Sequence, residues 1–240
     1  MKKIDAKGMD FTALNAAIRE ADGSCRIENC LGQRFIGAGM KGPDIEISGI
    51  PGNALGAYLA GAQITVRGNA QDAVGDTMND GSIVIHGSVG DAVGYAMRGG
   101  EIYVRGNAGY RAGIHMKEYR EKKPVLVIGG CAGSFLGEYQ AGGLILVLAL
   151  GAGERPPVSN FPCTGMHGGR MVLRGDAAGV KFPAGVNCRQ ATPEDLESLS
   201  PYIRKFAALF GYDGEALLAD RYTVITPDSR NPYKQMYVAN

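Results

Sequence analysis

Residues 61–113 read GAQITVRGNAQDAVGDTMNDGSIVIHGSVGDAVGYAMRGGEIYVRGNAGYRAG and contain nearly the same unit three times. Each unit has a strand-like I-x-V/I, a glycine, a loop, an apolar pair before a second glycine, and an apolar residue three positions later. The period is 19 residues. The columns that share it are Ile45, Ile64, Ile83 and Ile102; Gly49, Gly68, Gly87 and Gly106; Gly56, Gly75, Gly94 and Gly113; and Leu59, Met78, Met97 and Met116.

A unit of this length cannot bury its own apolar side, whereas stacked units can. The apolar alternation has a period of two, which is typical of strands and excludes helical repeats. Glycines in fixed columns are typical of corners that need a positive φ or a close approach of two backbones. The sequence therefore predicts an all-β fold, a single-stranded right-handed parallel β-helix of about seven coils, in which both glycine columns are structural.

The register continues beyond this block after two insertions. Leu126, Ile145 and Met171 take up the isoleucine column, and the added residues lie near 117–124 and 151–162. The predicted β-helix therefore spans residues 25–175.

Helical segments are expected on both sides of the β-helix. Residues 1–24 are predicted to form an N-terminal helical cap, with a helix that starts at Asp10. Residues 176–240 are predicted to form a C-terminal helical and extended tail. In that tail Thr192 begins a helix that we expect Pro201 to split in two.

The end of the tail lacks helical periodicity. Residues 222–225 are expected to be extended, and residues 227–240 to run over the surface of the solenoid or of a partner.

Two side-chain columns are expected to point outward from the strands. The third strand position is apolar in five coils and predicts either a partner interface or a surface covered by the protein's own tail. Its members are Val84, Tyr103, Val127, Leu146 and Val172. The fifth position carries the basic residues Arg67, His86, Arg105 and Arg174. The first three predict a second interface or simply solvated side chains.

The composition excludes several classes of function. The 25 basic and 24 acidic residues give no field for nucleic acid or anionic membranes. The five cysteines and three histidines match no metal, redox or catalytic motif, and we expect no catalytic, cofactor-binding or metal-binding residue in this chain. No secretory signal or membrane-spanning run is found, so a cytoplasmic location is expected.

The units Ile64–Met78 and Ile102–Gly109 resemble the GXGXG domain of the glutamate synthase large subunit, which also occurs as a separate polypeptide. The resemblance implies an architectural role. The domain holds an amidotransferase subunit against an FMN-binding synthase subunit, and FMN and an iron–sulfur cluster would belong to those partners. The family's nucleophilic cysteine at the mature N-terminus has no counterpart, because Met1 is followed by Lys2.

The leading hypothesis is a non-catalytic scaffold subunit of a split glutamate synthase, which forms glutamate from glutamine and 2-oxoglutarate; the chain could also form homo-oligomers. The alternatives are the β-helix subunits of two other enzymes. One is a molybdenum or tungsten formylmethanofuran dehydrogenase, whose β-helix resembles this domain, and the other is an N-methylglutamate synthase. An independent carbohydrate-binding β-helix is disfavoured, because the chain has no tryptophan and no paired carboxylates on one face.

Overall fold

The computed structural model describes residues 1–21 and 23–228, which form one 11-stranded sheet and three helices. The strands are β1 (Lys2–Asp5), β2 (Cys25–Leu31), β3 (Asp44–Ile50), β4 (Ala60–Val66), β5 (Asp80–Ile85), β6 (Glu101–Val104), β7 (Val125–Ile128), β8 (Ala141–Val147), β9 (Gly168–Arg174), β10 (Val186–Gln190) and β11 (Tyr222–Pro227). The helices are α1 (Phe11–Arg19), α2 (Pro193–Phe210) and α3 (Gly214–Leu218).

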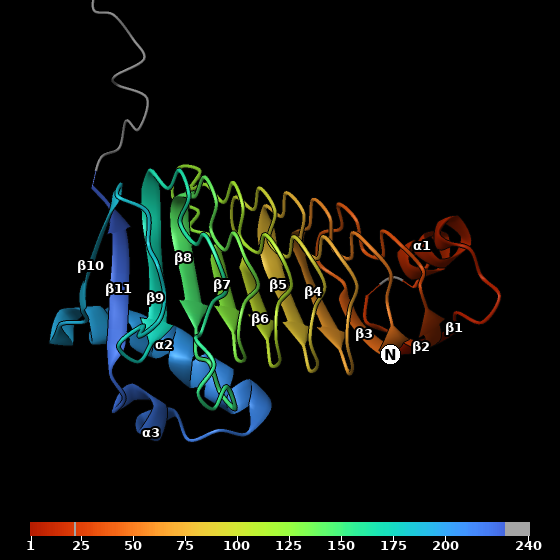
Figure 1. Ribbon diagram of the computed structural model, residues 1–240. Coiled ribbons are helices and arrows are strands. Elements are labelled where there is room, and N and C mark those ends of the chain that lie inside the picture. The colour runs from red at the N-terminus through yellow and green to blue at the C-terminus, as the bar shows by residue number, and fades with distance from the viewer. Residues whose placement is uncertain (22, 229–240) are drawn as a thin grey trace, which may run out of the picture.

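Strands β1 to β9 stack in chain order, each parallel to the next, into an elongated solenoid (Figure 1). The isoleucine column stays in register through the whole block and across both insertions. Ile83 pairs with Ile102, Ile102 with Leu126, and Ile145 with Met171. The predicted parallel β-helix and its register are confirmed.

Each coil turns a corner through three residues with left-handed backbone, separated by single residues. In one coil these are Ala73, Gly75 and Thr77, with φ of 56°, 69° and 52°. Their amides point alternately to the two neighbouring coils: Ala73 N and Thr77 N donate to Asp91 O and Tyr95 O of the next coil, at 2.8 and 2.7 Å, and Gly75 N donates to Leu55 O of the previous coil at 2.8 Å. The corners are therefore hydrogen-bonded as continuously as the strands.

The two glycine columns have different structural roles. Gly56, Gly75, Gly94 and Gly113 are the central left-handed residues of the corners, with φ between 65° and 70°. In the other column (Gly49, Gly68, Gly87 and Gly106) the glycine lies against the preceding coil. A Cβ on Gly87 would overlap the side chain of Asn69, whose Oδ1 accepts a hydrogen bond from Ser88 N at 2.8 Å. At Gly87 and Gly106 close approach, and not backbone freedom, requires glycine, whereas Gly49 also has a positive φ of 125°.

The N-terminal end differs from the expected helical cap in one respect. Asp10 caps α1 as expected, accepting a hydrogen bond from Ala13 N at 2.8 Å, and the helix packs Leu14 and Ile18 onto the first coil. However, residues before α1 form β1, which pairs with β2 from Lys2↔Cys25 onward. The sheet therefore begins at the second residue of the sequence.

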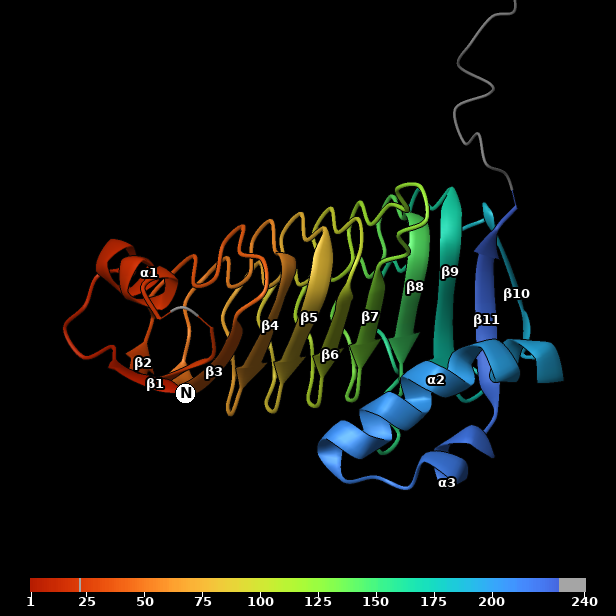
Figure 2. The same cartoon turned by 180° about the vertical axis from the view of Figure 1, so that it is seen from behind.

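The C-terminal tail adds two strands to the sheet and lays α2 across the solenoid (Figure 2). The expected extended segment is β11, which pairs antiparallel with β9, and β10 pairs antiparallel with β11 at the end of the sheet. Pro201 does not split the helix: α2 is continuous from Pro193 to Phe210. Pro201 cannot donate to Glu197 O, and the Ser200 hydroxyl donates to that oxygen instead, at 2.9 Å. Residues 229–240, which hold most of the expected surface-running end, lie outside the described residues.

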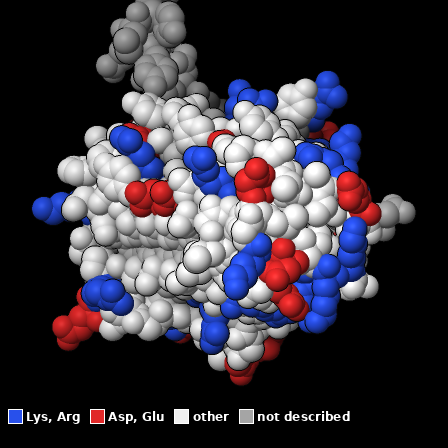
Figure 3. All heavy atoms as spheres, turned by 90° about the vertical axis from the view of Figure 1, so that its right-hand side faces the viewer, with Lys and Arg blue, Asp and Glu red and all other residues white. Residues whose placement is uncertain are grey.

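Charges of both signs are interspersed on the N-terminal end of the molecule, which faces the viewer in Figure 3. This pattern agrees with the near balance of acidic and basic residues in the sequence.

Candidate partner-binding surfaces

The apolar stripe that was expected either to face a partner or to be covered by the tail is covered by the tail. Its five residues are buried in a cluster with apolar residues of α2, α3 and β11. Tyr103 and Leu146 have no exposed surface, and Phe206 of α2 packs so closely on Gly129 that a Cβ there would collide with its ring. This stripe is therefore an internal interface and not a surface open to a partner.

Polar contacts fasten α2 along the edges of the stripe. Lys205 Nζ pairs with Glu101 of β6 at 2.5 Å and lies 5.1 Å from the centre of the Tyr103 ring. Arg170 of β9 donates to the hydroxyl of Ser198 at 2.9 Å. Burial, together with the nearby Glu101 carboxylate, raises the pKa of Tyr103, so its hydroxyl stays protonated under α2.

The basic column forms a ladder of side chains that starts from one carboxylate. Glu46 pairs with Arg26 and with Arg67, each at 2.7 Å, and hydrogen bonds from Arg67 and then from Arg26 lower its pKa. Arg67 Nη1 lies 3.3 Å from His86 Nε2. Burial, then the charges of Arg67 and Arg105, lower the pKa of His86 and favour a neutral imidazole that accepts from Arg67.

The surroundings differ among Arg67, His86 and Arg105. The His86 ring packs edge-on against Phe210 of α2 at 5.2 Å, and within residues 1–21 and 23–228 Arg105 forms no ion pair. The Glu46 carboxylate therefore offsets the repulsion between the positive side chains at the Arg67 end of the column and not at the Arg105 end.

A different surface, missed at the level of sequence, lies along the corners of the later coils. We call it the corner face and define it as Tyr95, Tyr110, Arg111, His115, Phe135, Glu138, Tyr139 and Phe161. One aromatic row runs from Tyr110 to Phe135 to Phe161, with ring centres 5.2 and 5.1 Å apart. The other runs from Tyr95 to His115 to Tyr139, at 6.0 and 5.2 Å.

An ion pair lies beside the first row of the corner face. Arg111 lies 5.1 Å from the centre of the Tyr110 ring and 5.5 Å from that of Phe135, and its Nε is 3.2 Å from the Glu138 carboxylate. Glu138 is only 8% exposed, whereas about half of the Arg111 side chain is exposed, so the ion pair is partly buried. Arg111, His115, Phe135 and Tyr139 all occupy left-handed corner positions, so the stacked corners hold their side chains in rows.

The aromatic and arginine content of the corner face is typical of the centre of a protein–protein interface. Tyr110, Tyr95 and Phe161 are 38%, 39% and 60% exposed, so the rows also present apolar surface to solvent. Insertions hide the pattern in the sequence, because the spacing from Arg111 to Phe135 and on to Phe161 is 24 and 26 residues instead of 19.

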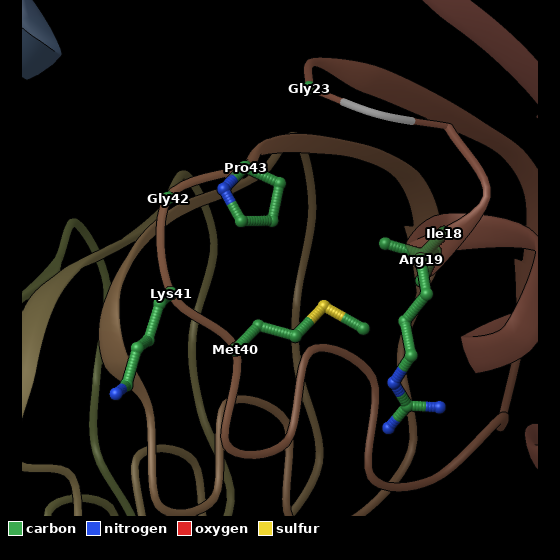
Figure 4. A pocket seen from close by; sticks show the side chains of 7 residues that line it. All are labelled: Ile18, Arg19, Gly23, Met40, Lys41, Gly42 and Pro43. Carbon is green, nitrogen blue, oxygen red and sulfur yellow. The ribbon is translucent and has the colours of Figure 1, made fainter.

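A cleft of about 440 Å³ lies between α1 and the segment before β3 (Figure 4). Met40 extends across it, Arg19 comes from the last turn of α1, and Lys41 lies on the opposite side. The cleft results from packing the cap helix on the first coil.

No three His, Cys, Asp or Glu side chains converge in a metal site in the part of the chain that the structure describes. Burial raises the pKa of the cysteine thiols, that of Cys30 to about 11, which keeps them protonated near neutral pH. Among the described helices, none has the length and apolarity to cross a bilayer.

Comparisons with known proteins agree with the repeat and the fold. The family described as "GXGXG motif" matches residues 7–228. The uncharacterized protein MJ1350 of Methanocaldococcus jannaschii is 44% identical over 248 residues, which cover 98% of this chain and 95% of that protein. A chain in the crystal structure of the formyltransferase/hydrolase complex (FhcABCD) from Methylorubrum extorquens with methylofuran has a similar fold, with a TM-score of 0.61, 19% identity, and coverage of 92% of this chain and 90% of that one. With its repeat, its stacked coils and this match across nearly the whole length, the chain belongs to the GXGXG family.

Proposed function

We propose that this chain is a non-catalytic structural subunit of a multi-subunit enzyme complex that processes a one-carbon unit on a furan-type carrier. The observation that carries the proposal is the corner face, an exposed aromatic surface built around a partly buried ion pair. The fold likeness supports the same view, since the similar chain comes from a formyltransferase/hydrolase complex. In this proposal the corner face binds a catalytic subunit, and any cofactor, such as a molybdenum or tungsten pterin, belongs to the partners.

The physical chemistry of the corner face supports a docking role. Aromatic rings and an arginine whose positions are already fixed lose little conformational entropy on binding. The Arg111–Glu138 pair is satisfied within this chain, so a partner that covers it leaves no unpaired charge.

A second candidate is the scaffold subunit of a split glutamate synthase or of an N-methylglutamate synthase. Membership of the GXGXG family supports it, because the repeat units resemble that domain of glutamate synthase. FMN and an iron–sulfur cluster would then lie in the partner subunits.

Native purification of the tagged chain from its source cells, followed by mass spectrometry, separates these candidates. Recovery of formyltransferase, hydrolase or molybdopterin-type subunits is the expected result. An amidotransferase together with a flavin-containing synthase would replace the first candidate by the second. Recovery of the chain alone would overturn both.

Changes on the corner face test its role directly. Replacing Tyr110 and Phe161 together by Ser is expected to weaken recovery of the partners at least about tenfold, because two exposed anchors of the face are removed. Leu31→Ser is the matched control, since Leu31 is 78% exposed but lies at the end of β2, outside the corner face. Equal recovery with Tyr110→Ser/Phe161→Ser and with Leu31→Ser, at unchanged melting temperatures, would remove the corner face from the proposal.

A further inference from the structure

An open-sided cavity of about 560 Å³ lies near the C-terminal end of the solenoid, away from the corner face. Three segments line it: the loop of residues 149–157 after β8, the end of β9 at Arg174, and the turn of Asp220 and Arg221 before β11. Figure 1 shows the loop leaving the lower end of β8 toward the side where α3 lies. The volume is that of a small-molecule site.

The charges that line this cavity are unbalanced. Three arginines, Arg155, Arg174 and Arg221, face one carboxylate, Asp220. Arg174 Nε pairs with Asp220 at 2.6 Å, and its Nη1 donates to Leu148 O at 3.2 Å. Arg155 donates only to the backbone oxygen of Ala152, at 3.2 Å, and in the described part of the chain neither Arg155 nor Arg221 forms an ion pair. Two guanidinium groups are therefore left without a counter-charge.

The walls of the cavity are tied to one another. Gly175 N donates to Arg221 O at 2.6 Å, and the Arg174–Asp220 pair joins the same two segments. In the facing loop, Gly153 lines the cavity with a left-handed φ of 62°, and its amide has no acceptor among residues 1–21 and 23–228. Unpaired amides and guanidinium forks are both donors that suit oxyanions.

We propose that this cavity binds a small polyanion with at least two phosphate or carboxylate groups. The planar forks of Arg155 and Arg221 each offer two parallel donors to one oxyanion, which is the geometry that guanidinium groups recognise. Asp220 holds Arg174 in place and limits the net positive charge of the walls to two. The inference is independent of the proposed scaffold role, because it concerns other residues.

Calorimetric titration of the full chain with pyrophosphate, and separately with citrate, at constant ionic strength tests this site. The expected result is saturable binding of at least one of the two probes at one site per chain, and the preferred probe tells phosphate from carboxylate chemistry. Arg155→Gln and Arg221→Gln are each expected to weaken that binding about tenfold, which corresponds to about 1.4 kcal/mol. Asp220→Asn is expected to tighten it, because the change removes the only negative charge of the wall.

Arg98→Gln is the matched control, since Arg98 is an exposed arginine that does not line the cavity. It should leave the affinity unchanged, and melting temperatures should confirm that the variants remain folded. Absence of saturable binding of both probes, or the same loss with Arg98→Gln as with Arg221→Gln, would overturn the proposal.

Discussion

At the scale of single residues, the central corner position does not always require glycine, since Cys163 occupies it with a φ of 60°, but Gly75 meets two constraints at once. Gly75 has a left-handed φ of 69°, and a Cβ on it would overlap Cδ1 of Ile102 in the next coil's inner ladder. Gly39 has nearly the same φ, 67°, but a Cβ there would meet nothing within 4 Å. The two positions therefore separate the cost of backbone strain from the cost of overlap in the core.

Alanine substitutions at these two glycines should have unequal effects. Gly39→Ala is expected to lower the free energy of unfolding by about 1 kcal/mol, the cost of a left-handed residue with a side chain. Gly75→Ala is expected to lower it further, by about 1–3 kcal/mol more, because a methyl group is forced into a close-packed core. Urea unfolding of both variants measures the difference. Equal losses of unfolding free energy would show that the Ile102 side chain shifts to accommodate the methyl group.

At the scale of elements, α2 is the part of the tail that turns an apolar strand surface into a second core. The column at the third strand position is covered from Val84 onward but not at Thr65, which lies one coil earlier and is partly exposed. Leu146 lies in the covered part and has no exposed surface. The same strand position thus has two environments within one molecule.

Lysine substitutions in this column should reveal the edge of the covered region. Leu146→Lys is expected to destabilise the fold by more than about 3 kcal/mol, because it buries a charge without a partner under α2. Thr65→Lys, the control in the same column, should change stability by no more than about 0.5 kcal/mol. Thermal melting and limited proteolysis of the tail are the measurements, and a stable Leu146→Lys variant with a protected tail would contradict the packing described above.

The sequence predicted the strands and their register because side-chain alternation and corner glycines are local signals. The predicted isoleucine column is observed: Ile83 pairs with Ile102, and Ile102 pairs with Leu126 across the first insertion. The sequence did not reveal β1, since its residues KKID have none of the repeat's features and only Ile4 is buried.

The rest of the fold and of the candidate surfaces depends on long-range packing. The stripe around Tyr103 and the apolar residues of α2 are both visible in the sequence, but periodicity cannot say that one covers the other. The corner face was hidden for a related reason, because insertions put Arg111, Phe135 and Phe161 out of the common spacing.

At the scale of the whole molecule, α2 makes the solenoid uneven along its axis. Coils of a repeat protein usually contact only their neighbours. Strands β3 and β4 follow that rule, whereas residues of β5 to β9 share one apolar cluster with α2. The later coils should therefore open together, and the earlier ones more independently.

Hydrogen exchange can measure this asymmetry. Under native conditions the amides of β6, β7 and β8 are expected to exchange more slowly than those of β3 and β4, because opening of the later strands must also release α2. The difference should shrink in the Leu146→Lys variant. Uniform protection along the solenoid of the unaltered chain would contradict the expectation.

The way the C-terminal tail closes the sheet also has a consequence for self-assembly. A stack of parallel strands ends in two edges that match each other, so copies of such a stack can add head to tail into open filaments. Here the antiparallel β11 interrupts the stack after β9, and β10, which again runs in the direction of β1 to β9, forms the last edge. The chain passes from β10 directly into α2 instead of into the corner of a further coil, so a copy added at this edge could pair with one strand but could not continue the hydrogen bonds of the corners. The tail therefore disfavours polymer growth along the solenoid axis.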